Sequence, residues 1–311
     1  MISYSVKRII SSIPVLAGVS ILAFLLGVMA PGDPAEFVLN QNGLSDPTEA
    51  QILAMREELG LNLPYWQQYI NWLTNILHGN LGTSYITGRS IASEIALRLP
   101  VTIQLACMAL WFAACCGIIS GVICAVYQNN FFDNMIKNIT NVMLAIPGFW
   151  LAMLLILLFS EKLRLLPTSG SDGFASFIMP AIVVSFSAMA TICRYMRSAL
   201  INEFDKQYFI IGRVRGLSRF KLLFVYALPN ALIPVIAMLG NYFAGILGGS
   251  VIAESIFAIP GISNMALEAI RFRDYPVLQG YVLVSGSILI FITTAVDVII
   301  AFINPKIKFG E

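Results

Sequence analysis

The sequence predicts an all-α integral membrane protein with six transmembrane helices and both termini in the cytoplasm. Of its 311 residues, 58% are hydrophobic and only 12% are charged, whereas about a quarter of the residues of a soluble domain are charged. One soluble core of this length could not bury so many apolar side chains, so the chain is expected to lie in lipid. In addition, six apolar runs are long enough to cross a hydrocarbon core of ~30 Å, which takes about 20 helical residues.

The six expected spans are separated by loops of very different length. They lie near residues 9–30, 100–126, 138–160, 176–196, 230–253 and 279–303. The first span begins like a secretory signal, since Lys7 and Arg8 precede its apolar run. However, the run is about 22 residues long, longer than such signals usually are, and Pro31 follows Ala30 where cleavage would occur. The run is therefore expected to remain as a membrane helix.

The lysines and arginines in the short flanks of the spans predict the orientation. Most of them gather on one side: Lys7, Arg8, Lys137, Arg194, Arg197, Lys206, Arg213, Arg215, Arg219, Lys221, Lys306 and Lys308. The other side holds Arg56, Arg89, Arg98, Lys162, Arg164, Arg271 and Arg273, several of them in one long loop that has little influence on orientation. The richly basic side is expected to face the cytoplasm.

The long loop after the first span carries helix signals of its own. Asp46 is expected to be an N-cap, with Pro47 at the first helical position and Gly60 at the end of that helix. A second helix is expected from about Pro64 to Leu77, where His78 precedes a glycine. The loop is therefore expected to be an extracytoplasmic helical region.

Two domains are expected from this organisation. Residues 1–99 would hold the first transmembrane helix and the extracytoplasmic helical loop, and residues 100–311 would form a five-helix core. Within that core, residues 197–229 make a long cytoplasmic loop that is rich in arginine and lysine.

Motifs of catalysis and of metal or nucleotide binding are absent from the sequence. All five cysteines (Cys107, Cys115, Cys116, Cys124 and Cys193) fall inside expected spans, where packing is their simplest role. The chain has a single histidine and no spacing typical of a metal site. It also has no Gly-Lys pair, so the usual phosphate loop is excluded. No cofactor, metal or nucleic-acid partner is expected, and the protein is not expected to be an enzyme.

The basic cytoplasmic loop has a pattern beyond its charge. Residues from Glu203 to Leu217 can be helical with Gly216 as a natural stop, and a second short helix can start at Ser218 and stop near Pro229. Charge alone is explained by the positive-inside rule and by anionic lipid headgroups. Two short helices that meet at a glycine instead favour a compact element, here called the basic knob (residues 203–229), that docks into a groove on a soluble partner.

Four separated motifs resemble one protein family. GRVRGLSRFKLLFVYALPNALIPVI (Gly212–Ile236) resembles the cytoplasmic coupling segment of permease subunits in bacterial ABC importers. LGGSVIAESIFAIPGISNMALEAIRFRDYPVLQG (Leu247–Gly280) looks like a signature of the dipeptide, oligopeptide and nickel import permeases, as do His78–Ala106 and AIPGFWLAMLLILLFS (Ala145–Ser160). The terminal NPKIK, at 304–308, is similar to the tail of the same family.

The resemblance implies a fold, a location and a set of partners. The fold would be that of a type I ABC importer permease in the bacterial cytoplasmic membrane. The partners would be a second homologous permease as a heterodimer, two cytoplasmic ATPase subunits and an extracytoplasmic solute-binding protein. Its family usually has small residues where this chain has Ile211 and Val214.

Two groups of residues are expected to carry the function. The ATPase-coupling residues would be Glu203, Tyr208, Gly212, Arg213, Arg215, Gly216, Leu217 and Ser218. The residues that line the pathway or face the binding protein would be Glu254, Arg271, Arg273 and Asp274. Asp297, near the cytoplasmic end of the last span, is expected to pair with a residue such as Arg194.

Several alternatives remain open at this point. A secondary transporter that works without an ATPase is the main rival class, although it would be expected to show inverted repeats and midplane charges. The substrate could be a short peptide or a metal chelate such as a nickel or metallophore complex. Several residues in the spans are expected to allow close helix approach or bending. They are Gly240, Gly245, Gly248 and Gly249, together with Pro147 and Gly148.

Overall fold

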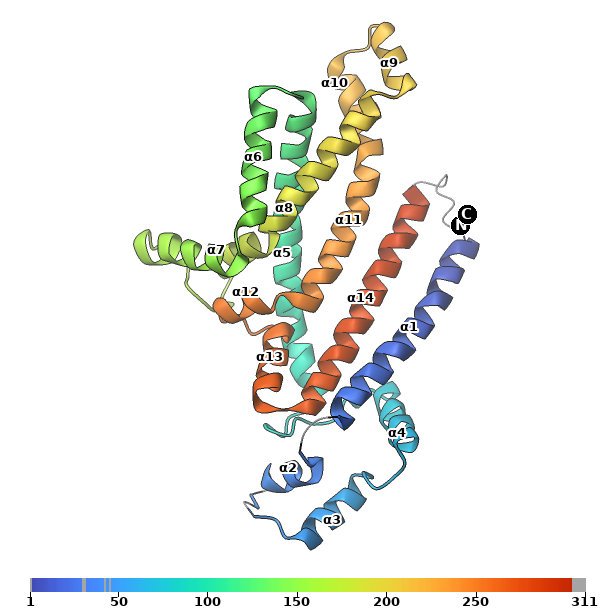
Figure 1. Cartoon of the computed structure of the whole chain (residues 1–311), viewed down its shortest axis with the longest axis vertical. Helices are drawn as coiled ribbons and strands as arrows, with labels where there is room; N and C mark the ends of the chain where they lie inside the picture. Colours follow the sequence, from blue (N-terminus) through green and yellow to red (C-terminus); the bar gives the residue numbers. More distant parts are fainter. Residues whose placement is uncertain (1, 30–31, 42, 45, 304–311) are drawn as a thin grey trace. The chain divides into compact units, whose positions relative to one another are not determined.

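The computed structural model describes residues 2–29, 32–41, 43–44 and 46–303 (Figure 1). Regular structure in this part of the chain is helical, apart from one isolated bridge between Thr83 and Ser90. The terminal NPKIK motif lies outside the described residues. The helices are α1 (Ile2–Val28), α2 (Pro34–Gln41), α3 (Glu49–Glu58), α4 (Tyr65–Leu77), α5 (Ile91–Val126), α6 (Phe131–Ala145), α7 (Gly148–Leu155), α8 (Ala175–Phe204), α9 (Gln207–Val214), α10 (Arg219–Lys221), α11 (Leu228–Gly249), α12 (Val251–Ile256), α13 (Ile262–Phe272) and α14 (Tyr275–Ile303), with π-helical segments η1 (Ile156–Lys162) and η2 (Leu222–Ala227).

Five helical stretches in the described residues are long and apolar enough to cross a membrane. They are Arg8–Val28, Ile91–Val126, Ala175–Phe204, Arg219–Gly248 and Tyr275–Ile300. A sixth span requires α6 together with α7 and η1, and this pair is bent by 101°. The expectation of six spans is thus confirmed in number only if the bent pair crosses as one.

The bend lies within the expected span over 138–160, at Pro147 and Gly148, where bending was expected. Its cause is Pro147, which has no N–H to donate and disfavours helical backbone at the residue before it. Ile146 accordingly has extended backbone, with φ −78° and ψ 122°. The helix resumes at Gly148, after Pro147 as N-cap.

The chain divides into two compact units. Unit 1 comprises Met1–Arg8, Ile103–Ile259 and Phe291–Glu311, and unit 2 comprises Ile9–Thr102 and Pro260–Ile290. Unit 1 therefore holds most of the membrane-spanning helices and the basic knob. Unit 2 holds the helical region that follows the first span, together with α13.

The core of unit 1 forms around α8, which packs against α6, α7 and α11. Its buried side chains are mostly small or aliphatic, including Ala113, Ile192, Met196, Leu200 and Ala231. Glycines of α5 allow the closest approach: a Cβ on Gly117 would lie 2.8 Å from Ile192, and one on Gly121 would lie 2.6 Å from Met196. Small residues at such crossings let membrane helices pack backbone to backbone.

Unit 2 contains the helices that were expected in the long loop. The expected N-cap at Asp46 is wrong, because α3 begins at Glu49 after the N-cap Thr48. The Thr48 N–H donates to Gln51 Oε1 at 2.9 Å in a capping box. The expected end at Gly60 is confirmed by its positive φ of 68°, and α4 matches the expected 64–77 helix.

In unit 2, α4 also packs against α1 through polar and aromatic contacts. The hydroxyls of Ser20 and Tyr69 lie 2.7 Å apart. The Phe24 ring contacts Tyr69 edge-on and Trp72 at a tilt, with centroids 5.4 and 5.7 Å apart. Both His78, as the C-cap residue, and its neighbour Gly79, with φ of 82°, lie at the end of α4 as expected.

Candidate functional site

The basic knob starts differently from the expected helix over 203–217. Glu203 belongs to the last turn of α8, and α9 begins only at Gln207. The buried Glu203 carboxylate accepts hydrogen bonds from Lys206 Nζ and Tyr208 Oη, both at 2.6 Å. Burial and this hydrogen bond raise the pKa of Tyr208 to about 12, so its hydroxyl remains a donor at physiological pH. These contacts fix the turn between α8 and α9.

Two glycines shape the knob for different reasons. A Cβ on the buried Gly212 would lie 2.6 Å from Leu222 Cδ2, so glycine here lets α9 pack closely on η2. By contrast, a Cβ on Gly216 would meet nothing within 4 Å, but its φ of 78° lies in the left-handed region. The expected stop at Gly216 is therefore confirmed by backbone conformation.

The second half of the knob begins as expected but does not end as expected. Ser218 is the N-cap of α10, and its Oγ accepts a hydrogen bond from the Lys221 N–H at 3.3 Å. The helix then continues through η2 into α11 rather than stopping near Pro229. The π-helical segment ends at Ala227, two residues before Pro229, and gives a local adjustment of the helix where the proline has no N–H to donate.

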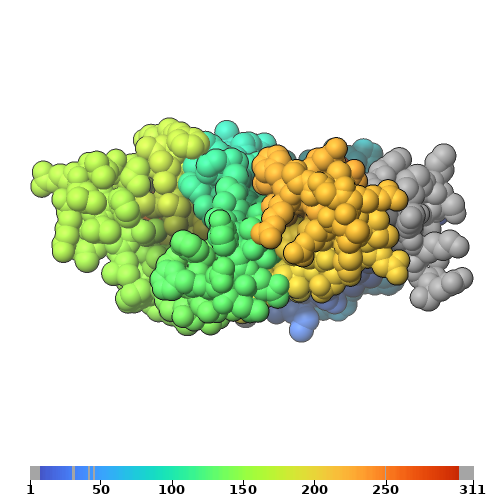
Figure 2. Space-filling model, turned by 90° about the horizontal axis from the view of Figure 1, so that it is seen from above, coloured from blue at the N-terminus to red at the C-terminus, as the bar shows by residue number. Residues whose placement is uncertain are grey.

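The outer surface of the knob combines positive charge with apolar side chains. Figure 2 looks onto this end of unit 1, with the knob in yellow and orange. Ile211 is 50% exposed, Val214 83% and Phe220 71%. Within the described part of the chain, Arg213 and Arg215 are exposed and form no ion pair. Such a surface fits a partner that supplies acidic and apolar groups.

A buried ion pair connects α6 to α8, whose far end leads into the knob. Asp133 is fully buried, and Arg197 binds it in a two-pronged contact with Nε–Oδ1 and Nη2–Oδ2 distances of 2.8 Å. The carboxylate also accepts from the Asn129 N–H at 2.9 Å and lies 3.2 Å from Lys137 Nζ. The sequence analysis missed Asp133. Its only signal was an acidic residue in a connection otherwise rich in apolar and amide side chains.

The outer candidates differ from one another in the structure. Arg271 and Arg273 are exposed, whereas Asp274 is buried, so within this chain only the two arginines are accessible to a partner. Asp274 accepts hydrogen bonds from Ser84 Oγ and, at 3.1 Å, from the Tyr85 N–H. Burial, together with the negative charge of Asp274, raises the pKa of Tyr85 to about 12. Asp274 therefore holds the 84–89 turn against the start of α14.

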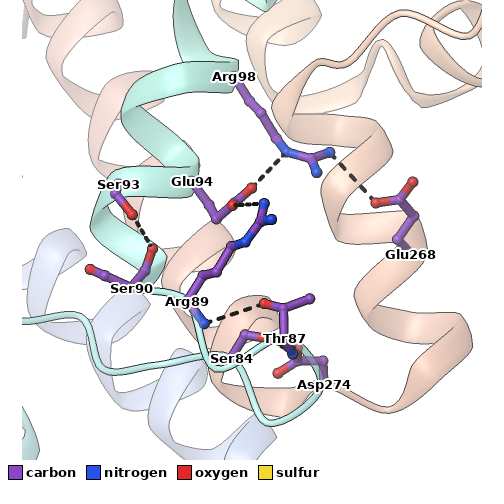
Figure 3. A network of polar contacts seen from close by, with 9 residues as sticks. All are labelled: Ser84, Thr87, Arg89, Ser90, Ser93, Glu94, Arg98, Glu268 and Asp274. Atoms are coloured by element: carbon purple, nitrogen blue, oxygen red, sulfur yellow. Dashed lines mark hydrogen bonds and ion pairs between the residues drawn. The ribbon is translucent and has the colours of Figure 1, made fainter.

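A chain of ion pairs runs from this turn to α13 (Figure 3). Arg98 lies between Glu94 of its own helix and Glu268 of α13, at 3.3 and 3.5 Å. Arg89 contacts Glu94 at 3.3 Å. Ser84 Oγ also accepts from the Thr87 N–H at 2.9 Å. The charges in this part of unit 2 are thus satisfied within the chain.

Glu254 and Asp297 also have partners within unit 1. Glu254 is fully buried in α12 and accepts from Ser250 Oγ at 2.7 Å. Ser250 lines a cavity whereas Glu254 itself does not, and a pathway role for Glu254 remains a prediction. Asp297 pairs with Arg8, not with Arg194, which donates instead to Asn141. Asp297 and Arg8 therefore join the two ends of the chain.

The glycines expected to allow close helix approach fall into two groups in the structure. A Cβ on Gly240 would lie 2.3 Å from Val296 Cγ2, so the expectation is confirmed there. Gly245 and Gly248 would meet nothing within 4 Å, and Gly148 would make only an ordinary contact at 3.9 Å to Val183. For these three positions, packing within the chain does not explain the glycine.

Two family models together match nearly the whole chain. The model for the binding-protein-dependent transport system inner membrane component matches residues 117–309, and the model for its N-terminal part matches residues 1–106. Among curated proteins, the chain is similar to the glutathione transport system permease protein GsiC of Escherichia coli K12. It is 34% identical to that protein over 310 residues, which are 99% of this chain and 100% of the relative. The GsiC protein of Shigella flexneri serotype 5b matches to the same extent.

A solved structure supports the same fold. The chain resembles a subunit in an inward-facing structure of the MetNI methionine ABC transporter, with a TM-score of 0.56 and 18% identity. The match covers 68% of this chain and 96% of that one. At this identity the likeness shows the fold of a type I importer permease.

The family assignment replaces the alternative of a secondary transporter. Permeases of this kind work in the membrane with ATPase and binding-protein partners, and the missing phosphate loop agrees with ATP hydrolysis by separate subunits. By its family models and its relatives, this chain belongs to the inner-membrane components of binding-protein-dependent transport systems, which are the multi-pass permease subunits of bacterial ABC importers.

Proposed function

We propose that this permease imports short peptides that a binding protein delivers from outside. The observation that carries the proposal is the 34% identity to a glutathione transport system permease along the whole of both chains, since glutathione is itself a small peptide. A metal chelate is the competing cargo. No group of acidic, histidine or cysteine side chains in the described residues could hold a bare metal ion, so such a cargo would have to bring its own ligands.

The basic knob is proposed as the docking element for the ATPase. Its coupling residues would be Glu203, Tyr208, Gly212, Arg213, Arg215, Gly216, Leu217 and Ser218. The geometry supports two roles: Glu203, Tyr208 and the two glycines give the knob its shape, while Arg213 and Arg215 offer unpaired charge. Closing of the ATPases on ATP would move the knob, and α8 and α11 would move with it as rigid elements.

The remaining partners are proposed from the membership of the chain in this permease family. A second homologous permease would complete the pathway as a heterodimer, and the binding protein would contact the exposed Arg271 and Arg273 through complementary charge. We also propose the division of the chain into 1–99 and 100–311, with 197–229 as the coupling loop.

Uptake by reconstituted vesicles tests the cargo. The chain, its second permease, the ATPases and the binding protein are placed in vesicles and given labelled glutathione, labelled Ala-Ala-Ala or a nickel–histidine chelate. We expect ATP-dependent uptake of a peptide and none of the chelate. Vesicles without ATP serve as the control for leakage. Uptake of the chelate with no uptake of either peptide would overturn the proposal.

A further inference from the structure

A cavity of about 440 Å³ lies among α7, α8, α11 and α12 of unit 1. Its volume falls within the ~300–1,000 Å³ range of small-molecule sites. Small and apolar residues form much of its wall, among them Gly148, Val183, Gly245 and Ala253. No charged side chain of the described residues lines it. The cavity thus suits an uncharged, partly polar group.

One polar side chain in the wall has no partner within the described part of the chain. Asn241 lies in α11, inside the stretch that is apolar enough to span the membrane, and its side chain is exposed and makes no hydrogen bond. An amide that faces hydrocarbon without a hydrogen-bond partner is strongly unfavourable. Asn241 must therefore face water, cargo or another protein.

The other polar groups of the cavity wall already have partners. Tyr242 Oη donates to the Val184 carbonyl oxygen at 2.5 Å. Ser250 Oγ donates to the buried Glu254 at 2.7 Å. Both hydroxyls thus fix the wall, and Asn241 is left as the group that can bind something inside the cavity.

Gly245 leaves open space one helical turn beyond Asn241, on the same face of α11. A Cβ at this position would meet nothing within 4 Å. Gly240 of the same helix shows the contrast, because its Cβ would lie 2.3 Å from Val296. Packing within this chain explains Gly240 but not Gly245, and Gly245 lines the cavity.

We propose that the Asn241 carboxamide pairs with a peptide group of the cargo in this cavity, and that the space beside Gly245 accepts an uncharged side chain. A carboxamide has an acceptor oxygen and N–H donors, which match the N–H and C=O of a peptide bond. The uncharged wall leaves the charged termini of the cargo to other surfaces. This inference rests on the proposed function, since it requires a peptide cargo.

Two variants of the complete reconstituted transporter test the inference. Asn241→Leu keeps the size of the side chain but removes its hydrogen bonds. We expect uptake of Ala-Ala-Ala to fall about fivefold, the effect of one uncharged hydrogen bond. For an analogue of this peptide with an ester in place of one peptide bond, Asn241→Leu should reduce uptake less, because the analogue already lacks the N–H. Gly245→Leu fills the cavity and should reduce uptake of Ala-Ala-Ala more than that of Gly-Gly-Gly.

Gly248→Leu is the matched control, because Gly248 lies on the same helix, is also open to a Cβ and does not line the cavity. It should leave uptake of both peptides unchanged. If the wild type takes up peptide and both cavity variants equal it, the inference fails while the proposed function stands. If the wild type takes up no peptide, both fail. If Asn241→Leu instead abolishes co-purification of the second permease, Asn241 belongs to the subunit interface and the inference is overturned.

Discussion

The basic knob and the ion-pair chain around the 84–89 turn use charge in opposite ways. Around that turn, Arg98 lies between Glu94 and Glu268, and the buried Asp274 accepts two hydrogen bonds from the turn. In the knob, Arg213 and Arg215 are exposed, with no ion pair among the described residues. Charges of the first kind hold the chain in shape, whereas charges of the second kind are available to a partner. Both groups of charges lie in or beside loops, so their position does not distinguish them. The presence or absence of ion-pair partners does.

The largest effect is expected from breaking the buried pair next to the knob. Asp133→Ala leaves Arg197 without its carboxylate, and removal of one partner of a buried ion pair costs about 3–5 kcal/mol. We expect a clear loss of thermal stability of the purified subunit in detergent. Asp205→Ala, at an exposed position after α8, is the control. Equal stability of the two variants would mean that paired charge here is not structural.

A smaller loss is expected at the outer turn. Asp274→Ala leaves Ser84 Oγ and the Tyr85 N–H without their acceptor, which costs about 1–3 kcal/mol when such groups are buried. The loss should be local, so amide hydrogen exchange at Tyr85 should accelerate while ATPase association stays unchanged. Unchanged exchange at Tyr85 would show that the turn is held by other contacts.

Gly216→Val tests whether the shape of the knob matters for docking of the ATPase. A β-branched residue in the left-handed conformation costs about 1–2 kcal/mol and re-aims α10 relative to α9. The membrane-inserted helices should remain folded, whereas ATPase pull-down and vesicle uptake should both fall. Gly170→Val, at another left-handed glycine outside the knob, controls for strain alone. Full association and full uptake in Gly216→Val would remove the knob from the coupling mechanism.

The exposed arginines of the knob should matter for association and not for folding. Arg213→Gln combined with Arg215→Gln should change the stability by less than about 0.5 kcal/mol, as at ordinary surface positions. ATPase binding should weaken and become less sensitive to salt, because screened charge pairs are lost. A salt dependence equal to that of the wild type would assign these arginines to lipid headgroups.

The smallest effect is expected at the outer arginines. Arg271→Glu with Arg273→Glu reverses two exposed charges, and exposed ion pairs contribute about 0–1 kcal/mol each. Stimulation of ATP hydrolysis by loaded binding protein should decline modestly at low salt and recover at high salt. If stimulation of the variant equals that of the wild type at every salt concentration, the binding protein does not contact this surface through these charges.

The sequence predicted those features that depend on local chemistry. The apolar runs, the left-handed stop at Gly216 and the N-cap at Ser218 follow from hydropathy, backbone freedom and a hydroxyl at the right spacing, and all are present. Where two local signals competed, the prediction failed. Asp46 and Thr48 are both good N-caps, and the reach of Gln51 to the Thr48 N–H decided for Thr48.

Features that depend on distant residues could not be predicted in this way. Asp274 is buried because Ser84 and Tyr85, far earlier in the chain, supply its hydrogen bonds. Asp297 could have paired with any arginine at a similar depth, and only the packing of the chain ends selects Arg8. The sequence marked Pro147 as a bend, but it gave no angle.

The π-helical segment η2 sets the rotational phase between α10 and α11. Successive residues of an α-helix are displaced by about 100° around its axis. A wider turn of the kind found over Leu222–Ala227 therefore shifts every later side chain around that axis relative to an uninterrupted α-helix. This shift determines the direction in which each side chain of α11, Asn241 among them, points relative to α10. The length of this one segment thus fixes the angular relation between α10, which belongs to the proposed docking element, and the side chains of α11.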